Sequence, residues 1–256
     1  MKLERRQVEK PWGREALPPP FGDTGGRRIG EIWFEGAGDL PLLAKYIFTS
    51  EKLSVQVHPD DAQARARGLP SGKSECWSIL EAEPGAVLGL GLKEPTNGER
   101  LRAAALDGSI EALMEWVPVR PGDFYFVPAG TVHAIGAGIA LLEFQQNSDV
   151  TYRLYDYGRP RALHLDDGVA VARPEPYRRQ AEAAAPVLFA GPPFTLLRTD
   201  GDAGLLGDRR RWVLPVEGSA RSGDEEAGPG ECLLLEPGAP LSLSGDAFIG
   251  AEGGLD

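Results

Sequence analysis

The segment PGDFYFVPAGTVH, residues 121–133, constrains the fold of this chain more than any other stretch. The aromatic and β-branched residues at 123–127 are typical of a strand. Pro128 cannot donate to a strand ladder and Gly130 permits a tight reversal, so this strand should end in a sharp bend. His133 then stands near the start of a second apolar run. The pattern predicts an imidazole directed into a β-barrel, either as a buried core residue or as a metal ligand.

Partners for His133 lie upstream, in the segments LSVQVHPDD and GKSECW. Gln56 and His58 are two residues apart in an alternating run, so their side chains point to the same face of a strand. Glu75 opens the next strand-like run. One amide, two imidazoles and one carboxylate can bind a catalytic divalent metal and leave a position open. Two of the chain's three histidines belong to this set, which favours a metal site over a structural role.

Composition narrows the classes of function. The chain has 256 residues, 42% of them hydrophobic, which suffices for one large domain or two small ones. A net charge of −11 disfavours nucleic acid and anionic membranes as partners, because both require clustered Lys and Arg. The two cysteines match neither a CxxC motif nor a disulfide framework. The sequence contains no recognisable signal peptide or membrane-spanning run, so we expect a cytoplasmic protein.

Short strand patterns separated by Gly, Asp or charged turns predict an all-β fold. Before residue 160 we expect strands at 31–35, 42–48, 53–58, 75–80, 86–90, 123–127, 132–135, 139–146 and 150–155. Residues 1–30 are rich in Pro, Gly and Arg and are predicted to be irregular.

Short helices interrupt this β pattern. One should begin at the Asp pair 60–61 and run to about Arg67. An insert at about 96–115 should contain two more, the first with a capping box that begins at Thr96 and the second capped by Asp107. Their apolar spacing indicates core packing, and we assign them no chemistry.

The end of the chain is predicted to be a separate unit. Residues 173–186 (RPEPYRRQAEAAAP) are charged, rich in Ala and bounded by Pro, as expected of a linker between a metal-binding domain at 1–172 and a β domain at 187–256. Strand patterns return at 187–190, 194–198, 211–216, 232–236 and 247–250. This unit is short for a complete barrel and no histidine follows His164, so its role should be structural.

The ordered motifs resemble those of type I mannose-6-phosphate isomerases of the short bacterial form, members of the cupin superfamily. The resemblance is carried by LSVQVHPDD (53–61), GKSECW (72–77), PAGTVHAI (128–135) and LLEFQQNSDVTYRLYDYGR (141–159). It covers nearly the whole chain and weakens after residue 186. It implies an all-β cupin jelly-roll barrel with short helical insertions and a reduced, cupin-like C-terminal unit.

The same resemblance implies the residues of the site. One zinc ion per chain, or another divalent metal in its place, would be held by Gln56, His58, Glu75 and His133. The catalytic residues would be Arg153, Lys73, Glu143 and Asp149. The substrate would be bound by Ser54, Lys73 and Arg153, with Ser54 as a candidate contact to its phosphate.

Structural roles stand as alternatives for several of these residues. Ser54 and Asp149 could instead form hydrogen bonds within a strand or turn. Lys73 could be a solvated loop cation. Arg153 could form an ion pair with Asp149 or Asp156.

The implied reaction interconverts mannose 6-phosphate and fructose 6-phosphate through a cis-enediol, so the expected partner is a small sugar phosphate. The sequence leaves the proton carrier open among Lys73, Glu143, Asp149 and a metal-bound water, and does not determine the oligomeric state. Alternatives are an isomerase acting on glucose 6-phosphate, an iron oxygenase, which usually has a more open ligand set, and a non-catalytic sugar-binding cupin.

Overall fold

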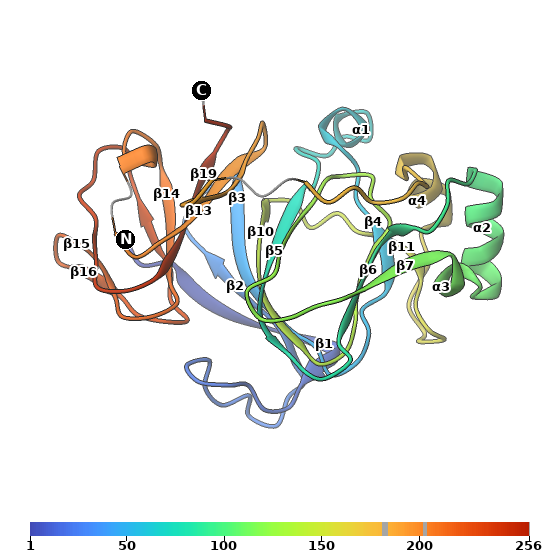
Figure 1. The fold of residues 1–256 in the computed structure, drawn as a ribbon, viewed down its shortest axis with the longest axis horizontal. Coiled ribbons are helices and arrows are strands. Elements are labelled where there is room, and N and C mark those ends of the chain that lie inside the picture. Colours follow the sequence, from blue (N-terminus) through green and yellow to red (C-terminus); the bar gives the residue numbers. More distant parts are fainter. Residues whose placement is uncertain (181–183, 202–203, 256) are drawn as a thin grey trace.

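The computed structural model describes residues 1–180, 184–201 and 204–255. Two antiparallel sheets enclose a barrel, which Figure 1 shows end-on, and a smaller group of strands lies beside it. Among the described residues, no helix is both long and apolar enough to cross a bilayer.

The first barrel sheet has six strands in the order β1-β2-β3-β10-β5-β8. These are β1 (Glu4–Arg14), β2 (Ile29–Glu35), β3 (Leu42–Phe48), β10 (Ile139–Gln146), β5 (Glu75–Ala82) and β8 (Phe124–Val127). β3 is buried at every position and β10 at all but its last. Both faces of these central strands are covered, one by the barrel interior and the other by the C-terminal strands.

The edge strand β1 shows that the prediction of irregular structure at residues 1–30 was wrong for much of that segment. Residues 4–9 and Arg14 of this strand pair with β2, and register shifts lie on both sides of Glu9, the second of them spanning Pro11. An edge strand meets solvent, so charged residues such as Arg6, which forms an ion pair with Glu35, replace the apolar alternation. The sequence pattern therefore lacked the usual mark of a strand.

The facing sheet has five strands in the order β11-β4-β9-β6-β7. These are β11 (Tyr152–Tyr155), β4 (Val55–Val57), β9 (His133–Ile135), β6 (Val87–Leu92) and β7 (Met114–Pro118). β4 and β9 are only three residues long and are joined through the single pair Gln56 and His133. This short seam places two of the predicted site residues next to each other.

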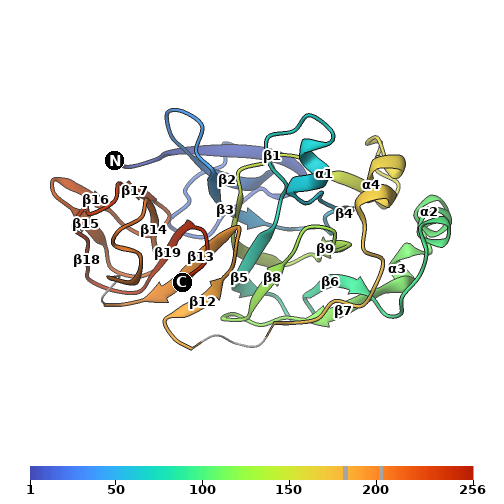
Figure 2. The same cartoon turned by 90° about the horizontal axis from the view of Figure 1, so that it is seen from above.

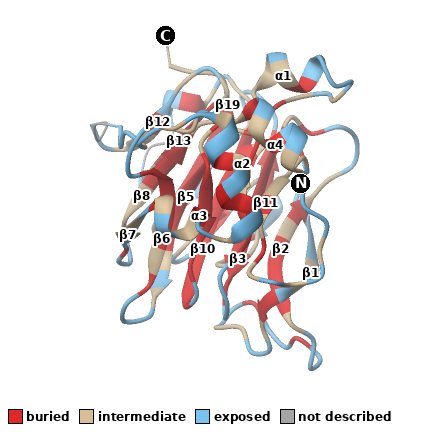
Figure 3. Cartoon of the chain, turned by 90° about the vertical axis from the view of Figure 1, so that its right-hand side faces the viewer, coloured by how far each residue is buried: buried red, intermediate tan, exposed pale blue. Residues whose placement is uncertain are grey.

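Four short helices lie outside the barrel: α1 (Asp61–Arg65), α2 (Gly98–Asp107), α3 (Ile110–Leu113) and α4 (Leu165–Val171). Figure 3 shows α2, α3 and α4 grouped on one side, and their buried residues form one cluster with those of β4. Asp60 caps α1 through a capping box, in agreement with the prediction.

The predicted caps of α2 and α3 were wrong. Asn97 caps α2, because its side chain accepts a hydrogen bond from the Arg100 N–H at 2.8 Å. The N-cap position of α3 is Ser109, and Asp107 instead accepts from the Ser109 N–H within the turn between the helices. Asn and Thr are both good N-caps, so local sequence does not decide between neighbouring candidates.

The C-terminal strands form a five-stranded sheet in the order β12-β13-β19-β14-β17 and a three-stranded sheet in the order β16-β15-β18. Their bounds are β12 (Val187–Ala190), β13 (Phe194–Thr199), β14 (Arg211–Pro215), β15 (Ala220–Ser222), β16 (Glu225–Ala227), β17 (Leu233–Leu235), β18 (Ser242–Leu243) and β19 (Ala247–Glu252), with a short 3₁₀ turn at Gly204–Leu206. Figure 2 shows this unit beside β3 and β5 of the barrel.

Aromatic side chains join the C-terminal sheet to the barrel. Phe144 of β10 meets Phe194 edge-on, with ring centroids 5.4 Å apart, and Phe126 of β8 stacks on Phe189 at 3.9 Å. These residues belong to one buried cluster that spans both units. The two units are therefore in direct contact through a common core.

Chain segments outside the strands also connect the two units. The Leu3 N–H donates to the Cys232 carbonyl at 2.8 Å, so the N-terminus extends the C-terminal sheet. In the predicted linker at 173–186, the Tyr177 hydroxyl donates to the Phe126 carbonyl of the barrel at 2.6 Å. Residues 181–183 of the linker lie outside the described residues. The domain boundaries at 172 and 187 stay predictions.

At Gly250, β19 packs closely against Phe144 of the barrel. A Cβ atom built there would overlap the ring of Phe144. We expect Gly250→Ala to lower the free energy of unfolding by about 1–3 kcal/mol, because the ring must leave its packed position. Urea denaturation would measure the change. Gly228→Ala is the matched control, since a Cβ there meets nothing within 4 Å, and equal midpoints for the two variants would contradict the expectation.

Candidate metal site

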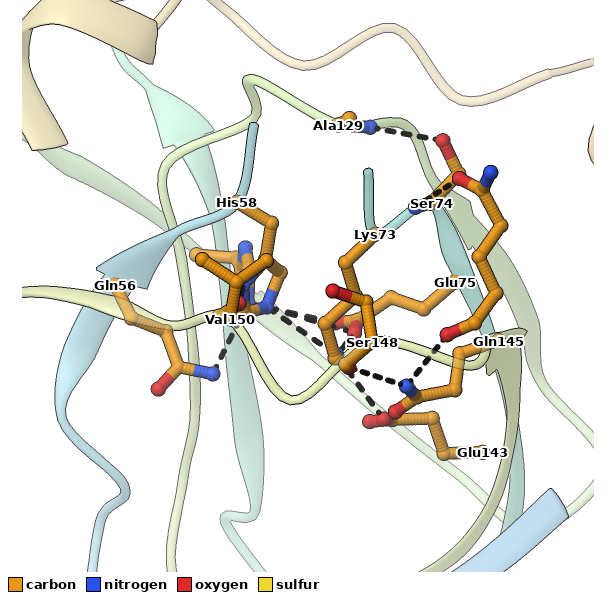
Figure 4. Close-up of polar contacts among 12 residues, drawn as sticks. Gln56, His58, Lys73, Ser74, Glu75, Ala129, Glu143, Gln145, Ser148 and Val150 are labelled. Carbon is orange, nitrogen blue, oxygen red and sulfur yellow. Dashed lines mark hydrogen bonds and ion pairs between the residues drawn. The ribbon is translucent and has the colours of Figure 1, made fainter. Parts of the chain in front are cut away.

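Three potential metal ligands meet inside the barrel. His58 follows β4, His133 begins β9, and Glu75 begins β5 in the opposite sheet. The Nε2 atoms of His58 and His133 lie 3.5 and 3.4 Å from Oε2 and Oε1 of Glu75, respectively. One ligand atom from each residue lies within 4.8 Å of the others, and all three side chains are buried. Figure 4 shows His58 and Glu75 directed toward the same space.

Backbone carbonyls orient both imidazoles. His58 Nδ1 lies 2.8 Å from the Val150 carbonyl, and His133 Nδ1 lies 2.9 Å from the Thr131 carbonyl. A carbonyl only accepts, so each Nδ1 carries hydrogen and each Nε2 presents a lone pair toward Glu75. Burial lowers the pKa of His133 to about 4 and holds the pKa of His58 well below its usual value. Both rings are therefore neutral, as metal ligands must be.

The bend after β8 holds the segment before His133 against the backbone of His58. Gly130 has φ of +88°, and its N–H donates to the His58 carbonyl at 2.8 Å. A side chain at this position would strain the left-handed backbone. The PAG segment thus connects the His133 strand directly to the backbone of His58.

The donor set fits a divalent cation. Glu75 Oε1 is buried without a hydrogen-bond partner, and an unpaired buried carboxylate oxygen is costly unless a cation meets it. Two imidazole nitrogens and a carboxylate suit a d¹⁰ ion such as zinc.

Gln56 lies beside the cluster, but its amide nitrogen is the atom that faces it. Gln56 Nε2 is 3.3 Å from His133 Nε2, while Gln56 Oε1 accepts from the Ser54 hydroxyl at 3.1 Å. Ligation by Gln56 requires the amide to rotate so that its oxygen faces the other ligands. Ser54 is hydrogen-bonded within its own strand segment and also faces the cavity beside the cluster.

The cavity beside the cluster has a volume of about 260 Å³. Charged side chains from both sheets and from the following loop line it: Lys10, Glu31, Lys45, Lys73, Glu143, Asp149, Arg153 and Arg161. Four of the lining residues are the catalytic candidates predicted from the sequence. Five of these side chains are basic and three are acidic, so the lining suits a small polar anion.

Lys73 connects the metal cluster to Glu143. Its Nζ contacts Glu75 Oε2, lies 3.3 Å from His58 Nε2 and donates to Glu143 Oε1 at 3.3 Å, as Figure 4 shows. Burial lowers the pKa of Lys73 to about 8. Lys73 is therefore not the solvated loop cation of the structural alternative.

Glu143 is held as an anion. Burial alone would raise its pKa, but Lys45, Lys73 and their hydrogen bonds bring it down to about 2. Its Oε1 also lies 2.9 Å from Lys45 Nζ, and its Oε2 accepts from the Trp77 indole N–H at 2.9 Å. With donors on both oxygens, this carboxylate is poorly suited to carrying protons.

Sequence reasoning missed Lys45 and Glu31. Lys45 is the one charged residue in β3, LLAKYIF, in which every position is buried. Its Nζ lies 4.0 Å from Glu31 Oε1, and Glu31 is in turn 3.3 Å from Lys10. A lysine inside a continuous apolar strand was the available signal, because an interior lysine requires a buried partner.

Arg153 has no carboxylate partner among the residues that the structure describes. Its Nη1 donates to the Ala162 carbonyl at 2.8 Å, and its Nε is buried with no partner. Within residues 1–180, 184–201 and 204–255, no carboxylate lies within ion-pair distance of Arg153. Asp156 instead binds Arg161 through both carboxylate oxygens, at 2.6 and 2.7 Å. Burial and the nearby Arg161 lower the pKa of Arg153, and the charge of Asp156 offsets them only in part.

His164 lies away from the metal cluster. Its ring Nδ1 accepts from the Arg153 backbone N–H at 3.1 Å, and the His164 backbone N–H donates to the Arg153 carbonyl at 2.8 Å. It occupies the N-cap position of α4 without a side-chain cap bond. Its contacts are those of a residue that supports the backbone of Arg153.

Comparison with known proteins shows sequence homology over about half of the chain. No family model matches the chain. The curated mannose-6-phosphate isomerase of Streptococcus mutans is 45% identical over 137 residues, which are 51% of this chain and 43% of that protein. The chain thus matches less than half the length of this relative.

Solved structures extend the likeness to nearly the whole chain. The mannose 6-phosphate isomerase of Bacillus subtilis superposes with a TM-score of 0.82 and 28% identity, covering 97% of this chain and 98% of that one. A mannose 6-phosphate isomerase bound with zinc and yttrium has the same fold, with a TM-score of 0.72, 17% identity and coverage of 98% and 99%. The predicted all-β cupin fold is confirmed, and the chain is homologous to mannose-6-phosphate isomerases.

Proposed function

We propose that this chain is a metal-dependent aldose–ketose isomerase that interconverts mannose 6-phosphate and fructose 6-phosphate. The observation that carries the proposal is the cluster of His58, Glu75 and His133 beside a charged cavity that Lys73 and Arg153 line. The similarity to mannose-6-phosphate isomerases supports the choice of substrate. A doubly charged sugar phosphate does not cross a bilayer unaided, which favours the cytoplasm as the place of action.

Zinc is the proposed metal. The residues that would hold it are His58, Glu75 and His133, with Gln56 as a fourth ligand after rotation of its amide. When bound, a divalent cation would polarise the sugar oxygens at C1 and C2 without redox chemistry.

The residues of the chain would then have distinct tasks. The reaction removes a proton from C2 of the aldose and returns one at C1, and negative charge develops on oxygen in between. Arg153, whose guanidinium cannot lose its proton in water, would stabilise that charge. Glu143 would act as a fixed anion that orients Lys73. Because Glu143 is held as an anion, Lys73 and Asp149 remain as the candidate proton carriers of the chain itself. Among the described residues, Asp149 forms no ion pair that would occupy its carboxylate.

The decisive experiment is isomerisation followed by proton NMR in D₂O. We expect the zinc-loaded protein to convert mannose 6-phosphate to fructose 6-phosphate, with solvent deuterium appearing at C1 of the product through the enediol. Glucose 6-phosphate, tested in parallel, should react far more slowly. Binding of mannose 6-phosphate without turnover would reject the enzyme in favour of a sugar-binding protein, and preferential turnover of glucose 6-phosphate would reject the substrate.

A further inference from the structure

A row of side chains with polar groups, buried except for the half-buried Trp33, crosses four neighbouring strands inside the barrel. Trp33 of β2 is the register partner of Lys45 in β3, Lys45 is the partner of Glu143 in β10, and Glu143 is the partner of Trp77 in β5. Directly opposed residues on one sheet face are within contact distance. The strand order therefore places Lys45 and Trp77 on either side of the Glu143 carboxylate.

The charges in and beside this row are removed from solvent. Lys45 is 6% exposed, Glu31 6% and Glu143 2%. Buried charges are stabilised only when they are paired and hydrogen-bonded. Lys45 is placed between the two carboxylates, and the Glu31 carboxylate also accepts from the Trp33 indole N–H at 2.7 Å.

The contacts of Glu143 differ in length. Lys45 Nζ and the Trp77 indole nitrogen are both 2.9 Å from its oxygens, whereas Lys73 Nζ is 3.3 Å away. The two short contacts fix the position of the carboxylate. Lys73 makes the longer contact, so its ammonium group is positioned against a carboxylate that Lys45 and Trp77 hold in place.

We infer that Lys45, held by Glu31, is a positioning residue that acts through Glu143 to keep the Lys73 ammonium aimed into the cavity. This inference rests on the proposed isomerase activity and adds to it a role for two residues outside the predicted site. Lys45 acts on the reaction without contacting the reacting atoms.

The kinetic test is a mutant cycle between Lys45 and Glu143 in the metal-loaded protein. We expect Lys45→Met to lower kcat by about 10–100-fold, the scale of a misplaced catalytic group, with KM changed less than about twofold. In a Glu143→Gln background, Lys45→Met should have no further effect, because the residue through which it acts is already altered. Independent, multiplying effects would show that Lys45 does not act through Glu143 and would overturn the inference, and so would unchanged kcat in Lys45→Met.

A spectroscopic readout separates this inference from the activity. The side-chain ¹⁵Nζ signal of Lys73, identified by its loss in Lys73→Met, should shift in Lys45→Met. It should stay in place in Lys52→Met, the control, since Lys52 is exposed and bound to Glu111. An unmoved Lys73 signal in Lys45→Met would refute the positioning role even if turnover fell. Absence of turnover in the unmodified protein would refute the proposed function instead.

Loss of Lys45 alone removes the cation between the Glu31 and Glu143 carboxylates, which is expected to destabilise the folded protein. The double variant Glu31→Gln with Lys45→Met removes one charge of each sign and keeps the balance. We expect it to fold and to show the same loss of kcat and the same Lys73 shift. Normal kcat in this variant would overturn the inference.

Discussion

Replacing His133 with alanine should give a folded protein that has lost its divalent metal and its isomerase activity. The substitution removes one of two imidazoles in the cluster and leaves His58 as the one remaining imidazole beside Glu75. Loss of a residue that merely orients a ligand costs about 10–100-fold in metal affinity, and loss of a ligand should cost at least as much. Elemental analysis after dialysis would measure the metal content, and His58→Ala should behave in the same way.

His164→Asn is the control for this experiment. His164 contacts the backbone of Arg153 rather than the cluster, so its replacement should leave the metal content unchanged. Full occupancy in either His58→Ala or His133→Ala would show that the metal site has been assigned to the wrong residues.

Arg153→Ala should lower kcat by about 10²–10³-fold with little change in KM, as expected when one stabiliser of a developing oxyanion is lost. The structural reason is the lack of a carboxylate partner among the described residues and the unpaired, buried Nε. Steady-state kinetics on mannose 6-phosphate would measure both constants. Arg100→Ala, on the exposed face of α2, should leave them unchanged.

Two other outcomes for Arg153→Ala have different meanings. If Arg153 holds the phosphate, whose charge is present throughout the reaction, KM should rise while kcat stays close to that of the unmodified protein. If its role is structural, thermal stability should fall while the folded fraction keeps its activity. Either result would exclude the assignment of Arg153 to the transition state.

The parts of the site that could be predicted are those that depend on local chemistry. Pro128 and Gly130 end one strand and start a reversal whatever surrounds them. Alternation alone places Gln56 and His58 on one face of a strand. The fold class followed from many short strands with turn residues between them.

The parts that could not be predicted depend on which strands are neighbours. Lys45 meets Glu143 because β10 inserts between β3 and β5, and nothing local to either residue encodes that pairing. The strand β1 was missed because an edge position removes the need for apolar alternation. The orientation of the Gln56 amide is set by its contacts with Ser54 and His133 and is likewise not encoded in spacing.

The short pairing of β4 with β9 lies beside the potential metal ligands. Closure of the two sheets on each other and binding of a divalent metal should therefore be thermodynamically coupled. Glu75 begins a strand of one sheet, whereas His58 follows β4 and His133 begins β9 in the other sheet, where the single pair Gln56 and His133 joins β4 to β9. A cation bound to all three can exist only when the sheets are closed on each other. The binding free energy of such a cation would therefore add to the stability of the closed barrel, and removing the cation with a chelator should lower that stability.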